Sequence, residues 1–270
     1  MPEKAHHTAY ESIRAWLASR CGIHYADEKR DLLIQRLSRV QRAFSYNNLD
    51  QLAHNLVTVP VSEVEIAVIS AASTNHTYFF REIEILTNFR ENILPLLKDR
   101  REIRIWSAAC STGDEAFTIA MIIADALGED ALRRTTILGT DISAPVIERA
   151  ELGIVSDRQV DKVPDHLREK YLKPVGLDQY QIADVIRRPC TFRRMNLRTT
   201  PYPFQNQFQV VFSRNVLYYF DGRSQADTLS AIHAVTEPGG WLITSVTESI
   251  RDLESPWVSE TNGIHRKAAK

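Results

Sequence analysis

Hydrophobic residues recur at helical spacing through the first third of the chain. One predicted helix carries its apolar positions at i, i+4, i+7 and i+11: Leu33, Leu37, Val40 and Phe44. Ser62 and Glu65 match a capping box at the start of a further helix. Because no strand pattern interrupts this stretch, we predict that residues 1 to about 95 form a helical N-terminal domain.

From Arg101 onward the pattern alternates between apolar strands and helices, which is typical of an α/β domain. We predict this domain over residues 96–270. Short apolar runs near residues 171–175, 180–186 and 191–192 break the alternation. We interpret them as the strands of a small antiparallel insertion at about 170–195. A further strand is expected at the end of the chain, over residues 263–267, at the edge of the main sheet.

The first apolar strand of this domain, which ends at Trp106, continues into a turn of small residues that contains Gly113. Small side chains let a ligand approach the backbone, and ligands of open α/β sheets bind at the carboxyl ends of strands. Asp114 and Glu115 then open a helix. A helix N-terminus attracts anions, so two acids there disfavour a pyrophosphate and suit a neutral or cationic ligand. The strict G-x-G-x-x-G pattern is absent, which disfavours a dinucleotide.

Asp141 ends the second predicted strand, about 26 residues beyond Glu115. An acid at this point of a nucleotide-binding βαβ unit commonly accepts hydrogen bonds from ribose hydroxyls. The spacing therefore favours a nucleoside site. The alternative is that Gly113 only makes a tight turn and that Asp141 and Ser143 cap the next helix.

Composition and charge exclude several classes of protein. The 270 residues are 44% hydrophobic, which is enough to build a core, and the net charge of −1 gives no bias toward nucleic acid. Three scattered cysteines make neither a disulfide framework nor a zinc site. No apolar run reaches the 18 or so residues of a membrane span, and the N-terminus lacks the apolar core of a signal peptide. We expect a soluble, cytoplasmic protein that binds neither metal nor nucleic acid.

The second predicted helix is unusually basic. Five basic residues lie between positions 29 and 42, against the single acid Asp31. At 100° per residue, Arg39 and Arg42 project away from the apolar face, and Arg36 lies on its flank. Such a surface is either a solvated helix face or a docking surface for an acidic partner.

A polar stretch that contains Asn75, Thr77 and Arg81 runs into an aromatic segment before the predicted helix at 83–97. A helix cap followed by aromatic core residues would give the same pattern. The spacing alone does not distinguish that cap from a ligand site.

Six segments, taken in order, resemble the motifs of the bacterial chemotaxis receptor methyltransferases: TNHTYFFRE (74–82), WSAACSTGDE (106–115), GTDIS (139–143), MNL (195–197), SRNVLYYFD (213–221) and PGGWL (238–242). The resemblance covers residues 10–267. It implies an S-adenosylmethionine-dependent protein-glutamate O-methyltransferase. The fold it implies is a helical N-terminal domain plus a Rossmann-like methyltransferase domain that carries a small antiparallel β-subdomain.

Residue roles are implied by the same resemblance. The cofactor-binding residues would be Asn75, Thr77, Arg81, Glu115, Asp141, Asn196, Leu197, Ser213, Arg214 and Asn215. Arg81 and Tyr219 match the residues nearest the transferring methyl group and are the predicted catalytic pair. Two departures are mild: GDEAF stands where the family usually has GEEPY, and Tyr218 replaces a more usual aliphatic residue.

The implied partner is the cytoplasmic helical region of a membrane chemoreceptor, with Arg36, Arg39 and Arg42 as the contact surface of a monomer that does not insert into the membrane. S-adenosylhomocysteine would be the product. In some family members the β-subdomain grips a C-terminal receptor peptide; the short connection at 176–178 and Pro189 lead us to expect none here. A small-molecule carboxyl methyltransferase and a cofactor-binding adaptor without catalysis are the alternatives.

Overall fold

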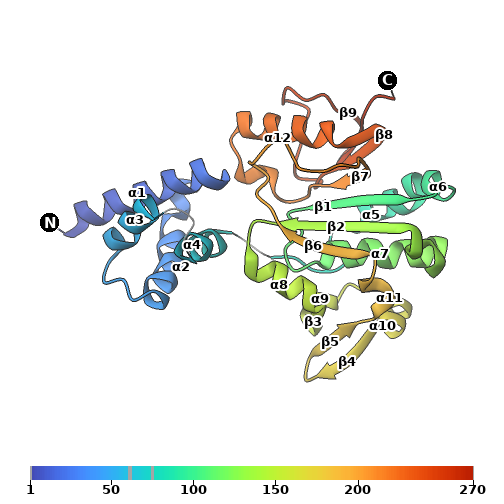
Figure 1. Cartoon of the computed structure of the whole chain (residues 1–270), viewed down its shortest axis with the longest axis horizontal. Helices are drawn as coiled ribbons and strands as arrows, with labels where there is room; N and C mark the ends of the chain where they lie inside the picture. The colour runs from blue at the N-terminus through green and yellow to red at the C-terminus, as the bar shows by residue number, and fades with distance from the viewer. Residues whose placement is uncertain (1, 60–62, 74–75, 270) are drawn as a thin grey trace.

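The computed structural model describes residues 2–59, 63–73 and 76–269, with side chains from residue 9 onward. The chain forms a group of N-terminal helices beside a layered α/β body (Figure 1). Ser62, expected to cap a helix, lies outside the described residues.

In the described part of the N-terminal group, the elements are α1 (Pro2–Cys21), η1 (Asp27–Lys29), α2 (Arg30–Ala43), α3 (Leu49–Thr58) and α4 (Glu63–Ala72). Their apolar faces share one core, in which Leu33 and Leu37 of α2 are completely buried, as the helical spacing predicts. Asn48 caps α3 by accepting a hydrogen bond from the Gln51 amide. None of the individual helices among the described residues combines the length and the apolar composition of a membrane span, although the bent pair α3–α4 together has both.

A seven-stranded sheet forms the centre of the α/β body, in the order β6-β2-β1-β7-β8-β10-β9. The strands are β1 (Ile103–Ala108), β2 (Thr135–Asp141), β6 (Cys190–Arg194), β7 (Phe208–Phe212), β8 (Thr236–Ile243), β9 (Val258–Thr261) and β10 (Ile264–Arg266). β6, β2, β1, β7 and β8 are parallel, whereas β10 runs antiparallel to β8 and β9.

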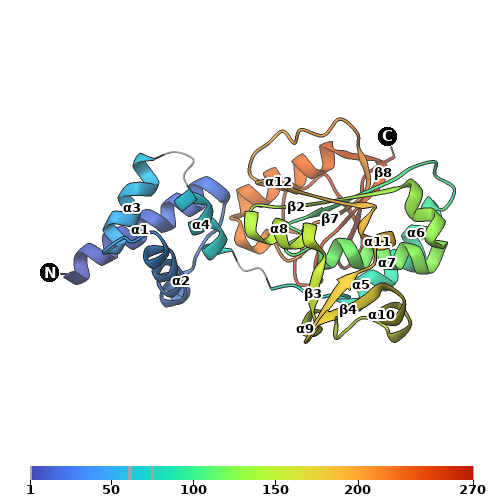
Figure 2. The ribbon, with the colours of Figure 1, turned by 60° about the horizontal axis from the view of Figure 1, so that its bottom comes forward.

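Helices cover both faces of this sheet (Figures 1 and 2). They are α7 (Asp114–Leu127), η3 (Glu129–Arg134), α8 (Ala144–Leu152), η4 (Leu217–Tyr219) and α12 (Gly222–Ala234). Successive strand residues point to opposite faces. Ile105 and Val210 therefore join the core under α7, whereas Trp106 and Val211 join the core under α12.

A separate three-stranded antiparallel sheet, in the order β3-β5-β4, projects from the body. It contains β3 (Ile154–Ser156), β4 (Leu172–Gly176) and β5 (Gln179–Ile182), and it is flanked by α9 (Asp157–Val160), α10 (Asp165–Tyr171) and α11 (Asp184–Arg187). The predicted small antiparallel subdomain is thus present, but its sheet begins with β3, before the predicted range of about 170–195, and ends with β5.

Two strand assignments made from the sequence are wrong. Residues 191–192 were expected in the small sheet, but they belong to β6, which pairs with β2 in the main sheet. Phe192 packs on Phe117 of α7 with ring centroids 5.3 Å apart, and this long-range contact leaves no local sequence signal. Pro189 therefore lies outside the small sheet. The terminal strand β10 is not at the sheet edge, because β9 pairs with its outer side.

The helical run before the sheet also differs from its expected place. It consists of α5 (Ile83–Asn88), a π-helical turn η2 (Phe89–Ile93) and α6 (Leu94–Leu97). Its apolar residues pack into the α/β core, with the Phe89 ring 5.2 Å from that of Phe212. The core of the N-terminal helices is built from residues 9–72 instead.

Hydrogen bonds between described residues join the N-terminal helices to the carboxyl edge of the sheet. Asn196 Nδ2 donates to the Arg20 carbonyl (2.9 Å), and the His24 amide donates to the Tyr219 carbonyl (3.0 Å). Ser143 Oγ donates to Ser70 Oγ (3.2 Å). The end of α1 is thereby fixed against the segments that follow β6 and β7.

Candidate functional site

The turn between β1 and α7 is built from backbone conformations that most residues avoid. Ala109, Ser111 and Gly113 have φ values of 64°, 49° and 86°. Such left-handed conformations in non-glycine residues are strained and cluster at ligand sites. The Cys110 amide donates to the Thr140 carbonyl (2.9 Å), which ties the turn to the end of β2. The turn therefore lies at the carboxyl edge of the sheet, where the sequence placed it.

Asp141 fixes this turn from the end of β2. Its Oδ2 accepts a hydrogen bond from the Ser111 amide (3.0 Å), and its Oδ1 accepts one from the Ser143 amide (2.9 Å). Burial raises the pKa of Asp141 above its ordinary value, although these backbone bonds oppose the rise. The carboxylate lines the pocket and keeps further lone pairs for ligand hydroxyls. The Ser143 side chain does not cap α8.

The two acids that open α7 have different surroundings. Asp114 is completely buried and accepts hydrogen bonds from Thr112 Oγ1 and from Gln159 Nε2. Burial raises the pKa of Asp114. Glu115 instead lines the pocket, where its Oε1 accepts a hydrogen bond from Ser107 Oγ (2.7 Å). Of the pair, Glu115 alone presents its charge to a ligand.

Arg214, just after β7, joins two acids from distant parts of the chain. Its Nη1 lies 3.0 Å from Glu115 Oε2, and its Nη2 lies 3.3 Å from Glu82 Oε2. Nη2 also donates to the Arg81 carbonyl. Although burial alone would raise it, the pKa of Glu82 is lowered by the Ser245 hydroxyl and the Arg214 charge. This network holds the segment at 81–82 against the edge of the sheet.

Glu248 supports the segment after β7. Its carboxylate accepts hydrogen bonds from the amides of Asn215 (2.7 Å) and Leu217 (2.9 Å). Burial raises the pKa of Glu248 despite these bonds. Asn215 itself has a left-handed φ of 59°. The acid thus stabilises a strained backbone that delivers Asn215 and Tyr219 to the pocket.

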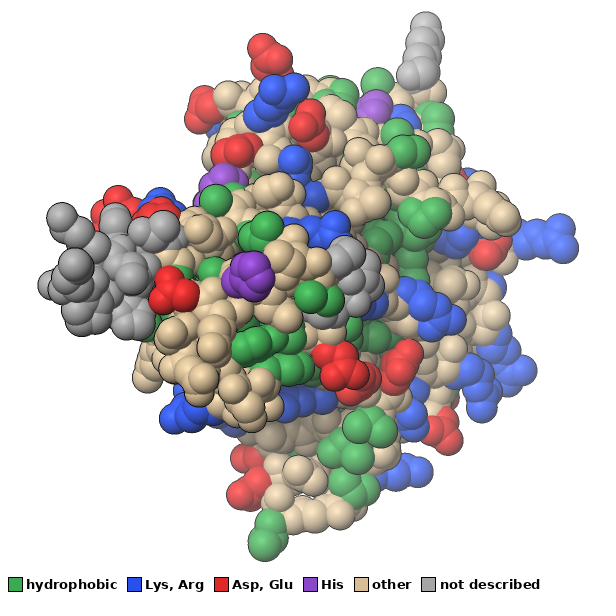
Figure 3. Space-filling model, turned by 60° about the vertical axis from the view of Figure 1, so that its left-hand side comes forward, with side chains coloured by type: hydrophobic (Ala, Val, Ile, Leu, Met, Phe, Trp, Pro, Cys, Tyr) green, Lys and Arg blue, Asp and Glu red, His purple; other side chains and the backbone are tan. Residues whose placement is uncertain are grey.

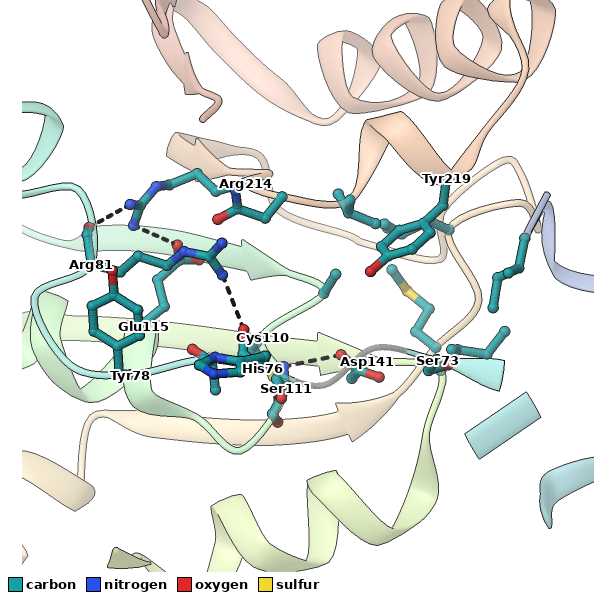
Figure 4. Close-up of a pocket in the computed structure, with 18 of the residues that line it drawn as sticks. Ser73, His76, Tyr78, Arg81, Cys110, Ser111, Glu115, Asp141, Arg214 and Tyr219 are labelled. Carbon is teal, nitrogen blue, oxygen red and sulfur yellow. Dashed lines mark hydrogen bonds and ion pairs between the residues drawn. The ribbon is translucent and has the colours of Figure 1, made fainter. Parts of the chain in front are cut away.

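Arg81 and Tyr219 enter the pocket from different segments (Figure 4). Arg81 Nη1 donates to the His76 carbonyl (3.0 Å), and its guanidinium lies 5.8 Å from the centroid of the Tyr78 ring. Tyr219 projects from η4 with its hydroxyl directed into the cavity. The two predicted catalytic side chains therefore line the same pocket.

The structure brings most of the predicted site together. One pocket is lined by nine of the predicted residues: Thr77, Arg81, Glu115, Asp141, Asn196, Leu197, Arg214, Asn215 and Tyr219. Ser213 is completely buried behind it and, among the described residues, its Oγ has no hydrogen-bond partner. Asn75 lies outside the described residues.

Sequence reasoning missed the two supporting acids, Glu82 and Glu248. Glu82 belongs to the same segment as Arg81, so its position could have been noticed. Glu248 follows β8 in a loop without any pattern, and only the folded chain shows its contacts.

The pocket suits a nucleoside that carries a cationic group. Asp141 offers a buried carboxylate acceptor for hydroxyls, Glu115 offers negative charge, and Leu197, Ile23 and Met195 offer apolar contact. These residue types fit S-adenosylmethionine. Among the residues that the structure describes, no group of His, Cys, Asp and Glu is arranged to hold a metal ion.

The three arginines predicted to face a partner are not equivalent. Arg39 and Arg42 are exposed on α2. Arg36 is half-buried, and its Nη1 donates to the Tyr25 hydroxyl (3.0 Å) and the Ala72 carbonyl (3.1 Å) at the end of α4. Arg36 therefore has a structural role within the helical group. Figure 3, viewed from the side of the N-terminal helices, shows basic and acidic side chains interspersed over that face.

Comparison with known proteins places both halves of the chain in one family. Residues 75–263 match the family model of the CheR methyltransferase SAM-binding domain, and residues 8–66 match the CheR methyltransferase all-alpha domain. The chemotaxis protein methyltransferase of Borreliella burgdorferi is 31% identical over 237 residues, which cover 85% of this chain and 84% of that protein.

Two enterobacterial relatives give the same result. The chemotaxis protein methyltransferase of Escherichia coli is 31% identical, and the match covers 91% of this chain and 85% of that protein. The Salmonella typhimurium protein of the same name is 32% identical, with 90% and 84% covered. The chain therefore belongs to the CheR family of S-adenosylmethionine-binding chemotaxis protein methyltransferases.

Proposed function

We propose that this methyltransferase transfers a methyl group from S-adenosylmethionine to glutamate side chains in the cytoplasmic helical region of a chemoreceptor, and so serves sensory adaptation. The observation that carries the proposal is the convergence of Arg81 and Tyr219 on the pocket that Glu115 and Asp141 line. The names of the relatives support a chemotaxis substrate.

Cofactor binding is assigned to the carboxyl edge of the sheet. Asp141 accepts hydrogen bonds from the ribose hydroxyls, and Glu115 faces the positively charged part of the ligand. Asn196 and Leu197 flank the adenine, while Arg214 and Asn215 close the pocket. Thr77 approaches from the segment before α5, and Ser213 supports the wall from behind. Asn75 lies outside the described residues, and its contact with the cofactor stays a prediction.

Bound in this pocket, S-adenosylmethionine supplies a methyl group attached to a positively charged sulfur. A glutamate carboxylate is ionised near neutral pH, so this chain needs no general base. Its residues instead orient the carboxylate and exclude water from it. Arg81 holds the substrate carboxylate, and Tyr219 orients it. A bidentate contact with Arg81 would lower the nucleophilicity of that carboxylate. A single hydrogen bond from Arg81 therefore suits the reaction better. The products are a glutamate methyl ester and S-adenosylhomocysteine.

Receptor recognition is assigned to the basic face of α2. Arg39 and Arg42 project into solvent, where their charges complement an acidic helical bundle. Arg36 contributes by holding α2 against the end of α4. We propose that the enzyme is a monomer and that it binds the receptor through this basic face of α2.

The test is incubation of the protein with methyl-labelled S-adenosylmethionine and receptor cytoplasmic fragments. We expect label in the receptor as base-labile methyl esters, and none in a fragment whose glutamates are replaced by glutamine. Arg81→Ala should lower kcat far more than it lowers cofactor affinity. Transfer to small carboxylic acids but not to the receptor would identify a small-molecule enzyme. Binding without transfer to either would identify an adaptor.

A further inference from the structure

Tyr218 and Tyr219 form a paired unit at the mouth of the pocket. The two hydroxyl oxygens lie 3.2 Å apart, with Tyr218 as the donor. Their ring centroids are 4.4 Å apart and the ring planes make an angle of 45°. Both residues belong to η4, whose backbone is held at Leu217 by Glu248 and at the Tyr219 carbonyl by the His24 amide. The pair is therefore presented by a fixed turn.

The two tyrosines have different surroundings. Tyr219 lines the pocket, whereas Tyr218 does not line it and is 52% exposed. The charges of Arg81 and Glu248 both act on Tyr218. The pKa of its hydroxyl is raised, first by partial burial and then by the hydrogen bond with Tyr219, so this hydroxyl keeps its proton at neutral pH. It is thus available as a donor.

A phenol hydroxyl carries one proton and accepts through its lone pairs. When Tyr218 donates to Tyr219, the oxygen of Tyr219 is occupied as an acceptor and its own O–H remains free to donate. An O–H bond to a carboxylate is a strong hydrogen bond, and a donor behind it polarises it further. The arrangement favours an anionic acceptor in front of Tyr219.

We propose that Tyr218 is a positioning residue that donates its hydrogen bond to Tyr219 and thereby directs the Tyr219 O–H toward the carboxylate of the substrate glutamate. The proposal rests on the proposed function, because it requires a glutamate substrate next to Tyr219. Tyr218 acts through the Tyr219 oxygen and does not contact the cofactor.

The competing role for Tyr218 is packing of its exposed ring against the receptor. Tyr218→Phe distinguishes the two, because it keeps the ring and removes only the hydroxyl. Packing alone predicts an unchanged kcat for Tyr218→Phe and a raised KM for receptor in Tyr218→Ile, and this pair of results would overturn the proposal.

The decisive experiment is a double-mutant cycle with Tyr218→Phe, Tyr219→Phe and the double variant, measuring kcat and the KM for receptor. We expect Tyr218→Phe to lower kcat roughly three- to tenfold in the wild-type background, the range of one hydrogen bond. In the Tyr219→Phe background the same substitution should have no effect on kcat. Additive losses, or an unchanged kcat in Tyr218→Phe, would show that Tyr218 does not work through Tyr219.

Two controls keep the results interpretable. The thermal midpoint should be the same in all four proteins, because the two hydroxyls bond to each other and neither supports the fold. Tyr218→Phe should bind S-adenosylhomocysteine like wild type, because Tyr218 does not line the pocket. Wild-type enzyme that transfers no label to receptor glutamates would overturn the proposed function and this role with it. Wild-type transfer with an additive cycle would overturn only the role of Tyr218.

Discussion

Arg214 Nη1 lies 3.0 Å from Glu115 Oε2, which joins the segment after β7 to the first turn of α7. The Arg214 side chain is only 3% exposed. The same guanidinium reaches Glu82, so one buried cation pairs with two acids from different elements. Loss of that cation would leave both carboxylates in a site with little access to water.

Arg214→Met should therefore destabilise the protein strongly. Removing one partner of a buried ion pair typically costs about 3–5 kcal/mol, because the remaining charge is uncompensated. Urea unfolding measures the change. The matched control is Arg133→Met, whose pair with Asp130 is 85% and 93% exposed and should be worth no more than about 1 kcal/mol. Equal effects of the two substitutions would contradict the structural role of Arg214.

The stability of the fold should depend on pH through Glu82. Its pKa in the folded protein is lowered from the ordinary 4.5, so its ionised form is favoured by folding. This contribution is present above pH 4.5 and is lost as the pH falls through the folded pKa. Glu82→Gln should consequently lose less unfolding free energy than wild type between about pH 6 and pH 3.

The measurement for Glu82 is urea unfolding at several pH values. Asp114, Asp141 and Glu248 have raised pKa values, so they act in the opposite direction. They are common to both proteins, and comparison of Glu82→Gln with wild type removes their contribution. Parallel pH profiles for the two proteins would refute this prediction.

Local sequence patterns correctly predicted those helices, strands and turns whose formation depends mainly on residues close together in the chain. The apolar spacing of α2, the turn after β1 and the acid at the end of β2 all lie where they were expected. Each depends on contacts within about thirty residues of the chain. Nine of the residues predicted from the family motifs also line one pocket.

Contacts between distant segments could not be predicted in this way. The sequence of β6 is typical of a strand in a small antiparallel sheet. Only its parallel pairing with β2, which the sequence does not indicate, shows that it belongs to the main sheet. Arg214 and Glu115 are 99 positions apart, and nothing in either motif indicates that they form an ion pair. Arg36 is a further example of a long-range contact that the sequence does not indicate. Its charge suggested a partner surface, but its guanidinium donates a hydrogen bond to the end of α4.

Asp141→Ala should weaken cofactor binding. The substitution removes the acceptor assigned to the ribose hydroxyls, and hydrogen bonds to a charged acceptor are each worth about 1.5–3 kcal/mol. We expect the affinity for S-adenosylhomocysteine to fall at least tenfold in calorimetry. Glu148→Ala, exposed on the neighbouring helix α8, is the control and should bind normally. Unchanged affinity in Asp141→Ala would remove this residue from the site.

Charge reversal at Arg39 should slow receptor methylation without changing cofactor affinity. The exposed charge attracts an acidic partner, and the wild-type rate should fall as salt screens that attraction. Arg39→Glu should reduce both the rate and its dependence on salt. Arg133→Glu carries the same charge change on η3 and should behave like wild type. Loss of cofactor binding in Arg39→Glu would instead indicate damage to the helical group.

The three-stranded sheet should not bind the C-terminal peptide of a receptor. A peptide that adds to a sheet needs backbone donors along an edge strand. Of the two edge strands, β3 has only three residues, whereas β4 contains Pro174, which has no N–H, and its register with β5 shifts between Pro174 and Gly176. We expect no micromolar binding in a calorimetric titration with such a peptide.

A matched pair of substrates tests the same point in the reaction. Receptor fragments with and without the C-terminal peptide should be methylated at the same rate, because without a tether the effective concentration does not change. Peptide binding to β4, the opposite outcome, would use exposed apolar side chains, and Val175 (54% exposed) and Leu177 (96% exposed) are the candidates. If the peptide binds with micromolar affinity and Val175→Asp abolishes that binding, then β4 accepts a strand in spite of Pro174. The irregular register would in that case be part of the peptide site, because the exposed Val175 lies where the register shifts, between Pro174 and Gly176.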